Sequence, residues 1–236
     1  MNPPSVELLL VLGVIGFYLQ DSAMLLHYDE IVVVQRRRGW SASVGSSAQA
    51  RGRYLYLPNP LCPGAALFRS SWLRGDASAP GEDWPGFAHF VAALRGFRIL
   101  CLLLACLLFL ALPALLWRFP HPLAMLALAA GIYATTALIG LRLWRYRGVL
   151  ELGGRQAAAL AFELLCCPPH AVNVVRRLCA RRGLRGDAVD AARRLLAPAQ
   201  RRPLVDEVGE RLAMAVDFHG DDVHLLGARQ RWERLR

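Results

Sequence analysis

The sequence predicts a mainly α-helical membrane protein with three transmembrane helices, a small β-containing cytoplasmic loop and a helical cytoplasmic tail. Three observations predict this fold class. Of the 236 residues, 55% are hydrophobic and only 19% are charged, whereas about 25% of the residues of soluble proteins are charged. The hydrophobic residues are concentrated in three long stretches. The basic residues other than histidine are all arginines. Almost all of them lie in the segments that three membrane crossings would place on the same side of the bilayer.

The first apolar stretch, Leu8 to Leu26, is interpreted as a retained membrane helix. Signal peptides begin with positive charge, but this stretch is preceded by the acidic Glu7 and by no arginine. Gln20 and Asp21 lie near its end, and a carboxylate inside a membrane helix is a candidate for proton relay or ion contact. His27 follows closely, so Asp21 could instead lie just below the headgroups, where a hydrogen bond to a neighbouring helix would suffice.

The second and third apolar stretches are predicted to form a tight transmembrane hairpin. The second, Ile99 to Trp117, has nineteen residues without a charge, enough to cross a hydrocarbon core at about 1.5 Å per residue. Pro113 is expected to kink this helix. The third lies between Pro122 and Arg142 and is equally long and uncharged.

The third stretch contains a stripe of small residues at four-residue spacing. Small residues at this spacing let helices approach closely in lipid, although the general abundance of alanine and glycine in membrane helices explains the stripe equally well. The candidate packing positions are Ala127, Gly131, Thr135 and Gly140, with Thr136 beside them.

The arginine distribution predicts a periplasmic amino terminus and a cytoplasmic carboxyl terminus. No arginine precedes the first stretch, and the hairpin turn has one, Arg118. The loop before the hairpin and the tail after it are rich in arginine, and such segments remain in the cytoplasm. The basic residues predicted to lie at the membrane surface are Arg36, Arg37, Arg38, Arg98, Arg142, Arg145 and Arg147.

The chain is therefore divided into four parts. They are a first transmembrane helix (1–28), a cytoplasmic loop (29–97), a transmembrane hairpin (98–145) and a cytoplasmic helical tail (146–236). In the loop, the β-branched run Ile31–Val34 and the run Tyr54–Leu57 predict a β-hairpin or meander, and Phe87–Arg95 predicts a surface helix. Helices in the tail are predicted at Ala157–Cys167, at 169 or 170 to 183, at Ala188–Ala197 capped by Asp187, and at Pro203–Met214, with a basic closing stretch from Val223 to Arg236.

Chemical motifs in the tail are weak. Zinc sites normally use closely spaced pairs of ligands, and no CxxC or HxxxH is present among Cys166, Cys167, His170, Cys179, His219 and His224. The acidic group Asp217, His219, Asp221 and Asp222 could bind a divalent cation or act as acid and base, but a turn that caps the last helix explains it as well. No Walker, GxGxxG or GxSxG motif occurs. No catalytic residue, cofactor or metal site is therefore predicted.

These features favour a non-catalytic subunit or scaffold of the bacterial inner membrane. Its cytoplasmic segments would dock other membrane or cytoplasmic proteins. One alternative is a component of a transport or secretion assembly that uses Asp21, and another is a membrane-bound enzyme that uses the cysteine, histidine and aspartate groups of the tail. Enzymatic activity is left undecided, with a non-enzyme favoured. The predicted partners are the lipid bilayer and other proteins; homo-oligomerisation is left open, and nucleic-acid binding is not expected despite the net charge of +10.

Overall fold

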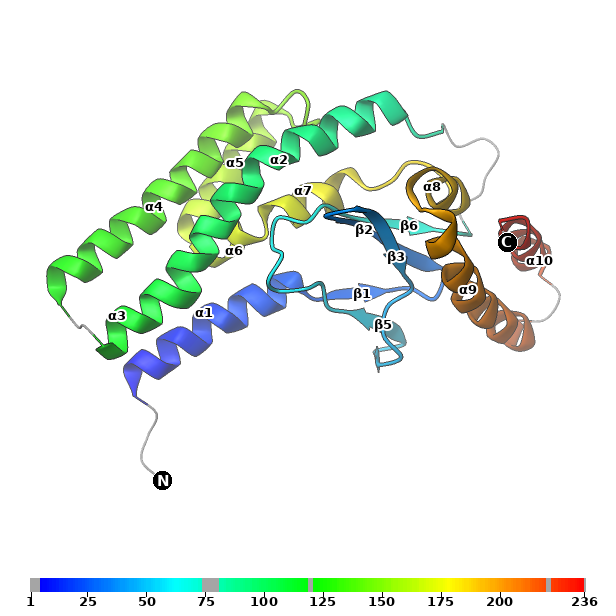
Figure 1. Cartoon of the computed structure of the whole chain (residues 1–236), viewed down its shortest axis with the longest axis horizontal. Helices are drawn as coiled ribbons and strands as arrows, with labels where there is room; N and C mark the ends of the chain where they lie inside the picture. The colour runs from blue at the N-terminus through cyan, green and yellow to red at the C-terminus, as the bar shows by residue number, and fades with distance from the viewer. Residues whose placement is uncertain (1–4, 74–80, 119–120, 220–221, 236) are drawn as a thin grey trace. The chain divides into compact units, whose positions relative to one another are not determined.

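The computed structural model describes residues 5–73, 81–118, 121–219 and 222–235, without the side chains of residues 218 and 219 (Figure 1). The chain divides into two compact units. The helical unit comprises Met1–Ala23, Pro58–Ala65 and Pro85–Leu178, and the α/β unit comprises Met24–Leu57, Ala66–Trp84 and Cys179–Arg236. Each unit is thus assembled from segments that are distant in the sequence.

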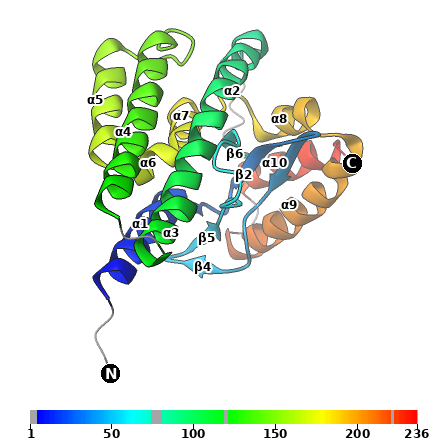
Figure 2. The same ribbon diagram turned by 60° about the vertical axis from the view of Figure 1, so that its left-hand side comes forward.

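The helical unit is built from helices of very different length. They are α1 (Val6–Ser22), α2 (Trp84–Cys106), the π-helical turn η1 (Leu107–Ala111), α3 (Leu112–Arg118), α4 (Pro122–Arg145), α5 (Gly154–Cys166), α6 (Pro168–Val172) and most of α7 (Val174–Arg182). Helix α4 packs along α5, and α1 contacts α6 and α3 (Figures 1 and 2). The predicted face of Phe87, Phe90, Val91 and Leu94 is buried, but these residues open one continuous helix with the second apolar stretch.

Two helical segments within the described residues are long and apolar enough to cross a membrane. They are Trp84–Arg118, which joins α2, η1 and α3 over 35 residues, and Pro122–Arg145, which has 24. Only 22% and 28% of the residues in their most apolar windows are buried. These segments include the two stretches of the predicted hairpin.

Helix α1 is shorter than the first predicted span. It has 17 residues and ends at Ser22, whereas a full crossing needs about 20. The Ala23 N–H donates the last hydrogen bond of the helix to the Leu19 carbonyl. The Ser22 hydroxyl donates to the Tyr18 carbonyl at 2.7 Å. Residues 24–26, which hydropathy assigns to the helix, form a strand instead.

A π-helical turn lies directly before Pro113, the position at which the sequence predicts a kink. Proline has no N–H to donate, and its ring collides with the carbonyl four residues earlier, here that of Phe109. The Leu112 N–H donates to the Leu107 carbonyl, five residues back, which widens the turn. The departure from α-helical hydrogen bonding is therefore confined to the turn before the proline, and the α-helix continues to Arg118.

The α/β unit contains two antiparallel three-stranded sheets. One has the order β1-β5-β4, and the other has the order β3-β2-β6. The strands are β1 (Met24–Leu26), β2 (Glu30–Arg36), β3 (Gly39–Ser43), β4 (Gln49–Ala50), β5 (Arg53–Tyr56) and β6 (Leu67–Ser71). The two runs predicted as strands are confirmed as β2 and β5, but they belong to different sheets. Strand β2 forms a hairpin with β3 through the exposed Arg37–Arg38 turn, where Gly39 has a φ of 127°.

Three helices complete the α/β unit. They are α8 (Ala188–Leu195), α9 (Pro198–His219) and α10 (Val223–Glu233). Their apolar faces form one core with the sheet residues Ile31 and Val33 and with the buried Trp72 and Trp232. The predicted cap is confirmed, because the Asp187 carboxylate accepts the Val189 N–H at 3.4 Å. Helix α9 begins at Pro198, so the prediction that it starts at Pro203 is wrong.

Candidate functional site

Charged side chains from α1 and α7 meet inside the helical unit. Asp21 lies in the last turn of α1, and Arg177 lies in the second turn of α7. The Arg177 guanidinium donates to Asp21 Oδ1 from Nη2 at 2.7 Å and from Nε at 2.9 Å. Its third nitrogen, Nη1, donates to Glu163 of α5. Arg177 therefore ties the end of α1 to α5.

The Asp21–Arg177 pair is largely shielded from solvent. Their side chains are 14% and 20% exposed. Burial by itself lowers the pKa of Arg177, but the hydrogen bonds to Asp21 and Glu163 outweigh it and hold the pKa above the ordinary arginine value. Arg177 is thus charged at every physiological pH, and it donates to the Asp21 carboxylate from two nitrogens, a geometry that makes such pairs stronger than neutral hydrogen bonds.

Arg176 lies beside this pair and is more deeply buried, with 5% of its surface exposed. Its Nη1 donates to the Ser22 hydroxyl at 2.9 Å and to Asn173 Oδ1 at 3.0 Å. Its Nη2 donates to the Asn59 carbonyl at 2.9 Å, while Nε has no partner. Among the described residues, no carboxylate lies within ion-pair distance of Arg176. Its charge is therefore compensated by neutral oxygens.

The end of α1 supplies part of this compensation. The carboxyl end of a helix carries partial negative charge, and α1 has no basic residue of its own in its last turn. Arg176 and Arg177 are consecutive on α7, so their side chains point about 100° apart and can reach Ser22 and Asp21 respectively. The Asn173 amide adds hydrogen bonds to the Tyr18 carbonyl and to Ser22 at 3.2 and 2.9 Å.

The loop of residues 58–65 covers the same cluster. The Tyr18 hydroxyl donates to the Pro60 carbonyl at 2.8 Å, and the Asn59 carbonyl accepts from Arg176. Gly64 lies directly on α2, where a Cβ would be 2.9 Å from Arg98 Cα. We call Tyr18, Asp21, Ser22, Asn173, Arg176 and Arg177, with the Asn59 carbonyl, the α1–α7 polar cluster.

Only part of the predicted polar site joins the α1–α7 polar cluster. Asp21 does, whereas Gln20 is exposed. The other members of the cluster were not predicted from the sequence: Tyr18, Ser22, Asn59, Asn173, Arg176 and Arg177. One signal could have found Asn173: it is a single amide within the apolar run AVNVV, where a buried polar group needs hydrogen-bond partners.

The predicted surface arginines fall into several environments. Arg36, Arg37 and Arg38 are exposed around the β2–β3 turn. In the helical unit, Arg147 donates to the Trp144 carbonyl at 3.1 Å and stacks over the Trp144 ring. Arg98 packs against Gly64, and Arg142 and Arg145 line grooves at the carboxyl end of α4.

The small residues predicted to form a packing stripe on α4 have different surroundings. Ala127 is exposed, and the nearest atom to a Cβ at Gly131 would be Leu107 Cδ1 at 3.8 Å. The buried Thr135 donates to the Gly131 carbonyl of its own helix at 2.7 Å. Close approach occurs at Gly140, where a Cβ would be 3.3 Å from Ala161 Cβ of α5.

The described cysteine and histidine side chains of the tail form no candidate metal site. Within the residues that the structure describes, no group of three or more His, Cys, Asp or Glu side chains could hold a metal ion. Cys179 is buried, whereas Cys166 is exposed. In the acidic group, Asp222 caps α10 by accepting the His224 N–H at 2.9 Å. Asp221 and the side chain of His219 lie outside the described part.

The α1–α7 polar cluster holds several elements of the helical unit together by electrostatic interactions. It joins the end of α1, the 58–65 loop, α5 and α7 through charge-assisted hydrogen bonds, which stabilise by about 1.5–3 kcal/mol each. No protein-family model, curated protein or solved structure matches the chain.

Proposed function

We propose that the chain is an integral protein of the bacterial inner membrane that acts as a non-catalytic subunit or scaffold. Its amino terminus and hairpin turn would face the periplasm, and its loop and tail would face the cytoplasm. The observation that carries this proposal is the contrast between the two units: one exposes its apolar residues, and the other encloses them.

The apolar side chains of the helical unit support membrane insertion. Ile99 is 74% exposed, Leu110 is 67% exposed and Leu123 is 69% exposed. Soluble proteins rarely expose contiguous apolar patches of more than a few hundred Å², whereas lipid tails would solvate such residues. Helix α1 also exposes Leu9 and Leu12, and we propose that it enters the bilayer as a short third segment.

The α/β unit supports the scaffold part of the proposal. It encloses two fully buried tryptophans, Trp72 and Trp232, in its own core, and it presents the exposed Arg36–Arg38 turn. Such a unit can project from a membrane and bind another protein. A binding role also fits the α1–α7 polar cluster better than ion transport does, because Asp21 is already neutralised by Arg177.

Two experiments test this proposal. After extraction of membranes with alkaline carbonate, the chain is expected to remain in the pellet. Crosslinking in intact membranes, followed by purification in mild detergent, is expected to recover a partner protein in stoichiometric amount. A stable, monodisperse preparation without detergent would contradict membrane insertion. Turnover of a lipid or thiol substrate by the purified chain would contradict the non-catalytic role.

A further inference from the structure

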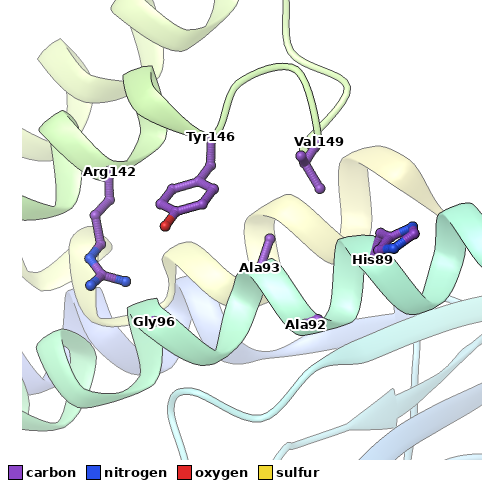
Figure 3. Close-up of a pocket in the computed structure, with 7 residues that line it drawn as sticks. All are labelled: His89, Ala92, Ala93, Gly96, Arg142, Tyr146 and Val149. Atoms are coloured by element: carbon purple, nitrogen blue, oxygen red, sulfur yellow. The ribbon is translucent and has the colours of Figure 1, made fainter.

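Two adjoining cavities lie between α2 and α4 in the helical unit. One has a volume of about 360 Å³, and the other has a volume of about 440 Å³. Both are lined by Arg142 and Tyr146 at the carboxyl end of α4, so they form one groove, which we call the α2–α4 groove. In Figure 3, Arg142 and Tyr146 reach from α4 toward α2, which contributes His89, Ala92, Ala93 and Gly96.

The α2–α4 groove is strongly positive. Arg142 lines both cavities, and Arg145 lines the larger one. In the part of the chain that the structure describes, neither guanidinium forms an ion pair or donates a hydrogen bond. Arg147 differs, because it is held by the Trp144 carbonyl and ring. Two cations therefore face the groove without a compensating anion.

Gly96 determines where the Arg142 guanidinium lies. A Cβ at this position would be 1.6 Å from Arg142 Nη1, so any side chain would displace the guanidinium. Glycine inside a helix costs about 1 kcal/mol relative to alanine, and here it leaves the space that the guanidinium occupies. Ala92 and Ala93 extend the same surface of small residues (Figure 3).

The other end of the α2–α4 groove is apolar. Leu100 of α2 and Leu138 and Leu141 of α4 line the larger cavity together with the two arginines. From Leu138 to Tyr146, α4 rises about 12 Å at 1.5 Å per residue. The groove therefore changes from leucine-lined to arginine-lined within about two turns of α4.

We propose that the α2–α4 groove binds an anionic phospholipid. Arg142 and Arg145 bind its phosphate, because guanidinium forks match phosphate oxygens, and an acyl chain lies along Leu100, Leu138 and Leu141. The apolar end favours a lipid over free phosphate as the occupant. The inference rests on the membrane insertion proposed above, which places this end of α4 at the cytoplasmic surface.

Lipid binding to the detergent-purified chain tests the proposal, with native mass spectrometry as the readout. Dioleoyl phosphatidylglycerol is titrated in parallel with dioleoyl phosphatidylcholine. The wild-type chain is expected to bind phosphatidylglycerol more tightly. The double variant Arg142→Gln/Arg145→Gln is expected to lose about thirtyfold in that affinity, because each arginine near an anionic headgroup contributes about 1 kcal/mol and both are removed. The matched control Arg147→Gln is expected to stay within about twofold of wild type.

A second variant separates the shape of the groove from its charge. Ala93→Phe fills the groove and keeps both arginines, and it is also expected to weaken phosphatidylglycerol binding. Thermal unfolding of each variant checks its fold. Wild-type affinity in the double variant would overturn the proposal, as would an equal loss in Arg147→Gln. Saturation by inorganic phosphate at the same affinity would overturn the assignment to a lipid.

Membrane fractionation separates this inference from the proposed function. If the wild-type chain is released by alkaline carbonate, membrane insertion itself is wrong. If the wild type and both groove variants stay in the pellet but bind phosphatidylglycerol equally, only the groove assignment is wrong.

Discussion

Asp21 shows how the surroundings of one carboxylate distinguish a proton relay from a structural contact. A relay needs a group that exchanges protons, which usually means a carboxylate without a fixed cation. Asp21 instead accepts hydrogen bonds from two nitrogens of the Arg177 guanidinium, Nε and Nη2, near the end of α1. We infer that the main contribution of Asp21 is to hold α1 in place.

Asp21→Asn is expected to lower the midpoint of thermal unfolding in detergent, since the amide keeps the shape but loses the charge. The loss should correspond to about 1–3 kcal/mol, the range for a charge-assisted hydrogen bond whose partner is left behind. Arg177→Gln should be at least as destabilising, because it also releases Glu163. In a double-mutant cycle, the two effects should not add.

Gln20→Ala is the matched control for this cycle. Gln20 precedes Asp21 and is exposed, so its removal should leave the midpoint unchanged. An Asp21→Asn variant that unfolds at the wild-type temperature would show that Asp21 does not fix α1.

Asp187 provides a pH-dependent prediction. Burial raises its pKa above the ordinary aspartate value, although the Val189 N–H and Arg231 oppose this shift. The pKa of Asp187 is therefore higher in the folded chain than in the unfolded chain. Its contribution to stability is fully present when the pH is below the pKa of the unfolded chain, and it is lost as the pH rises through the pKa of the folded chain. Asn also caps helices well. We therefore compare the thermal unfolding midpoints of Asp187→Asn and the wild type. The midpoint of the variant relative to that of the wild type should increase from pH 4 to pH 7, and a decrease over this range would contradict the raised pKa.

At the scale of elements, the 58–65 loop depends on its contact with α2. A Cβ on Gly64 would lie 2.8–2.9 Å from Arg98 Cγ, Cα and Cβ. Because one of these atoms is backbone, the strain cannot be relieved by rotating a side chain. The same loop provides the carbonyl groups that bind Tyr18 and Arg176.

Gly64→Ala is accordingly expected to lower the unfolding midpoint by the equivalent of about 1–3 kcal/mol, the usual cost of overpacking. Gly16→Ala is the control, because no atom lies within 4 Å of its Cβ position and the residue is inside α1. Helix propensity predicts that Gly16→Ala is neutral or stabilising by up to about 1 kcal/mol. Equal midpoints for the two variants would mean that the loop does not pack as described.

The elements that the sequence predicted best are those with a strong local signal. The long apolar runs of α2 and α4, the β-branched core of β2 and the Asp187 cap are all recognisable within one window of residues. Strands β3 and β6 were missed, because GWSAS and LFRSS contain no β-branched residue and are held by backbone hydrogen bonds to β2. The end of α1 was misplaced because Met24–Leu26 is as apolar as a helix, and its pairing with β5 depends on residues about thirty positions away.

At the scale of the whole molecule, the two compact units do not correspond to consecutive stretches of the sequence. The loop and the tail were predicted as separate segments, yet residues 24–57, 66–84 and 179–236 form one compact unit. Its core brings Ile31 and Trp72 together with Val208 and Trp232. Apolar contacts are not directional, so periodicity identifies which faces are buried but does not identify what covers them. Asp21 could be singled out from its apolar neighbours in the sequence, whereas its partner Arg177 could not, because it lies 156 positions later in the chain.

In the proposed topology, α2–α3 and α4 form a membrane hairpin, and the arginine-rich segments lie on one side of the bilayer. Labelling of single cysteines in intact cells tests it directly, in a background in which the six native cysteines are replaced. A membrane-impermeant maleimide is expected to modify His121→Cys in intact cells, and to modify Arg37→Cys and Gln230→Cys only after the inner membrane is permeabilised. Labelling of Arg37→Cys and Gln230→Cys on opposite sides, or of His121→Cys only after permeabilisation, would contradict the account.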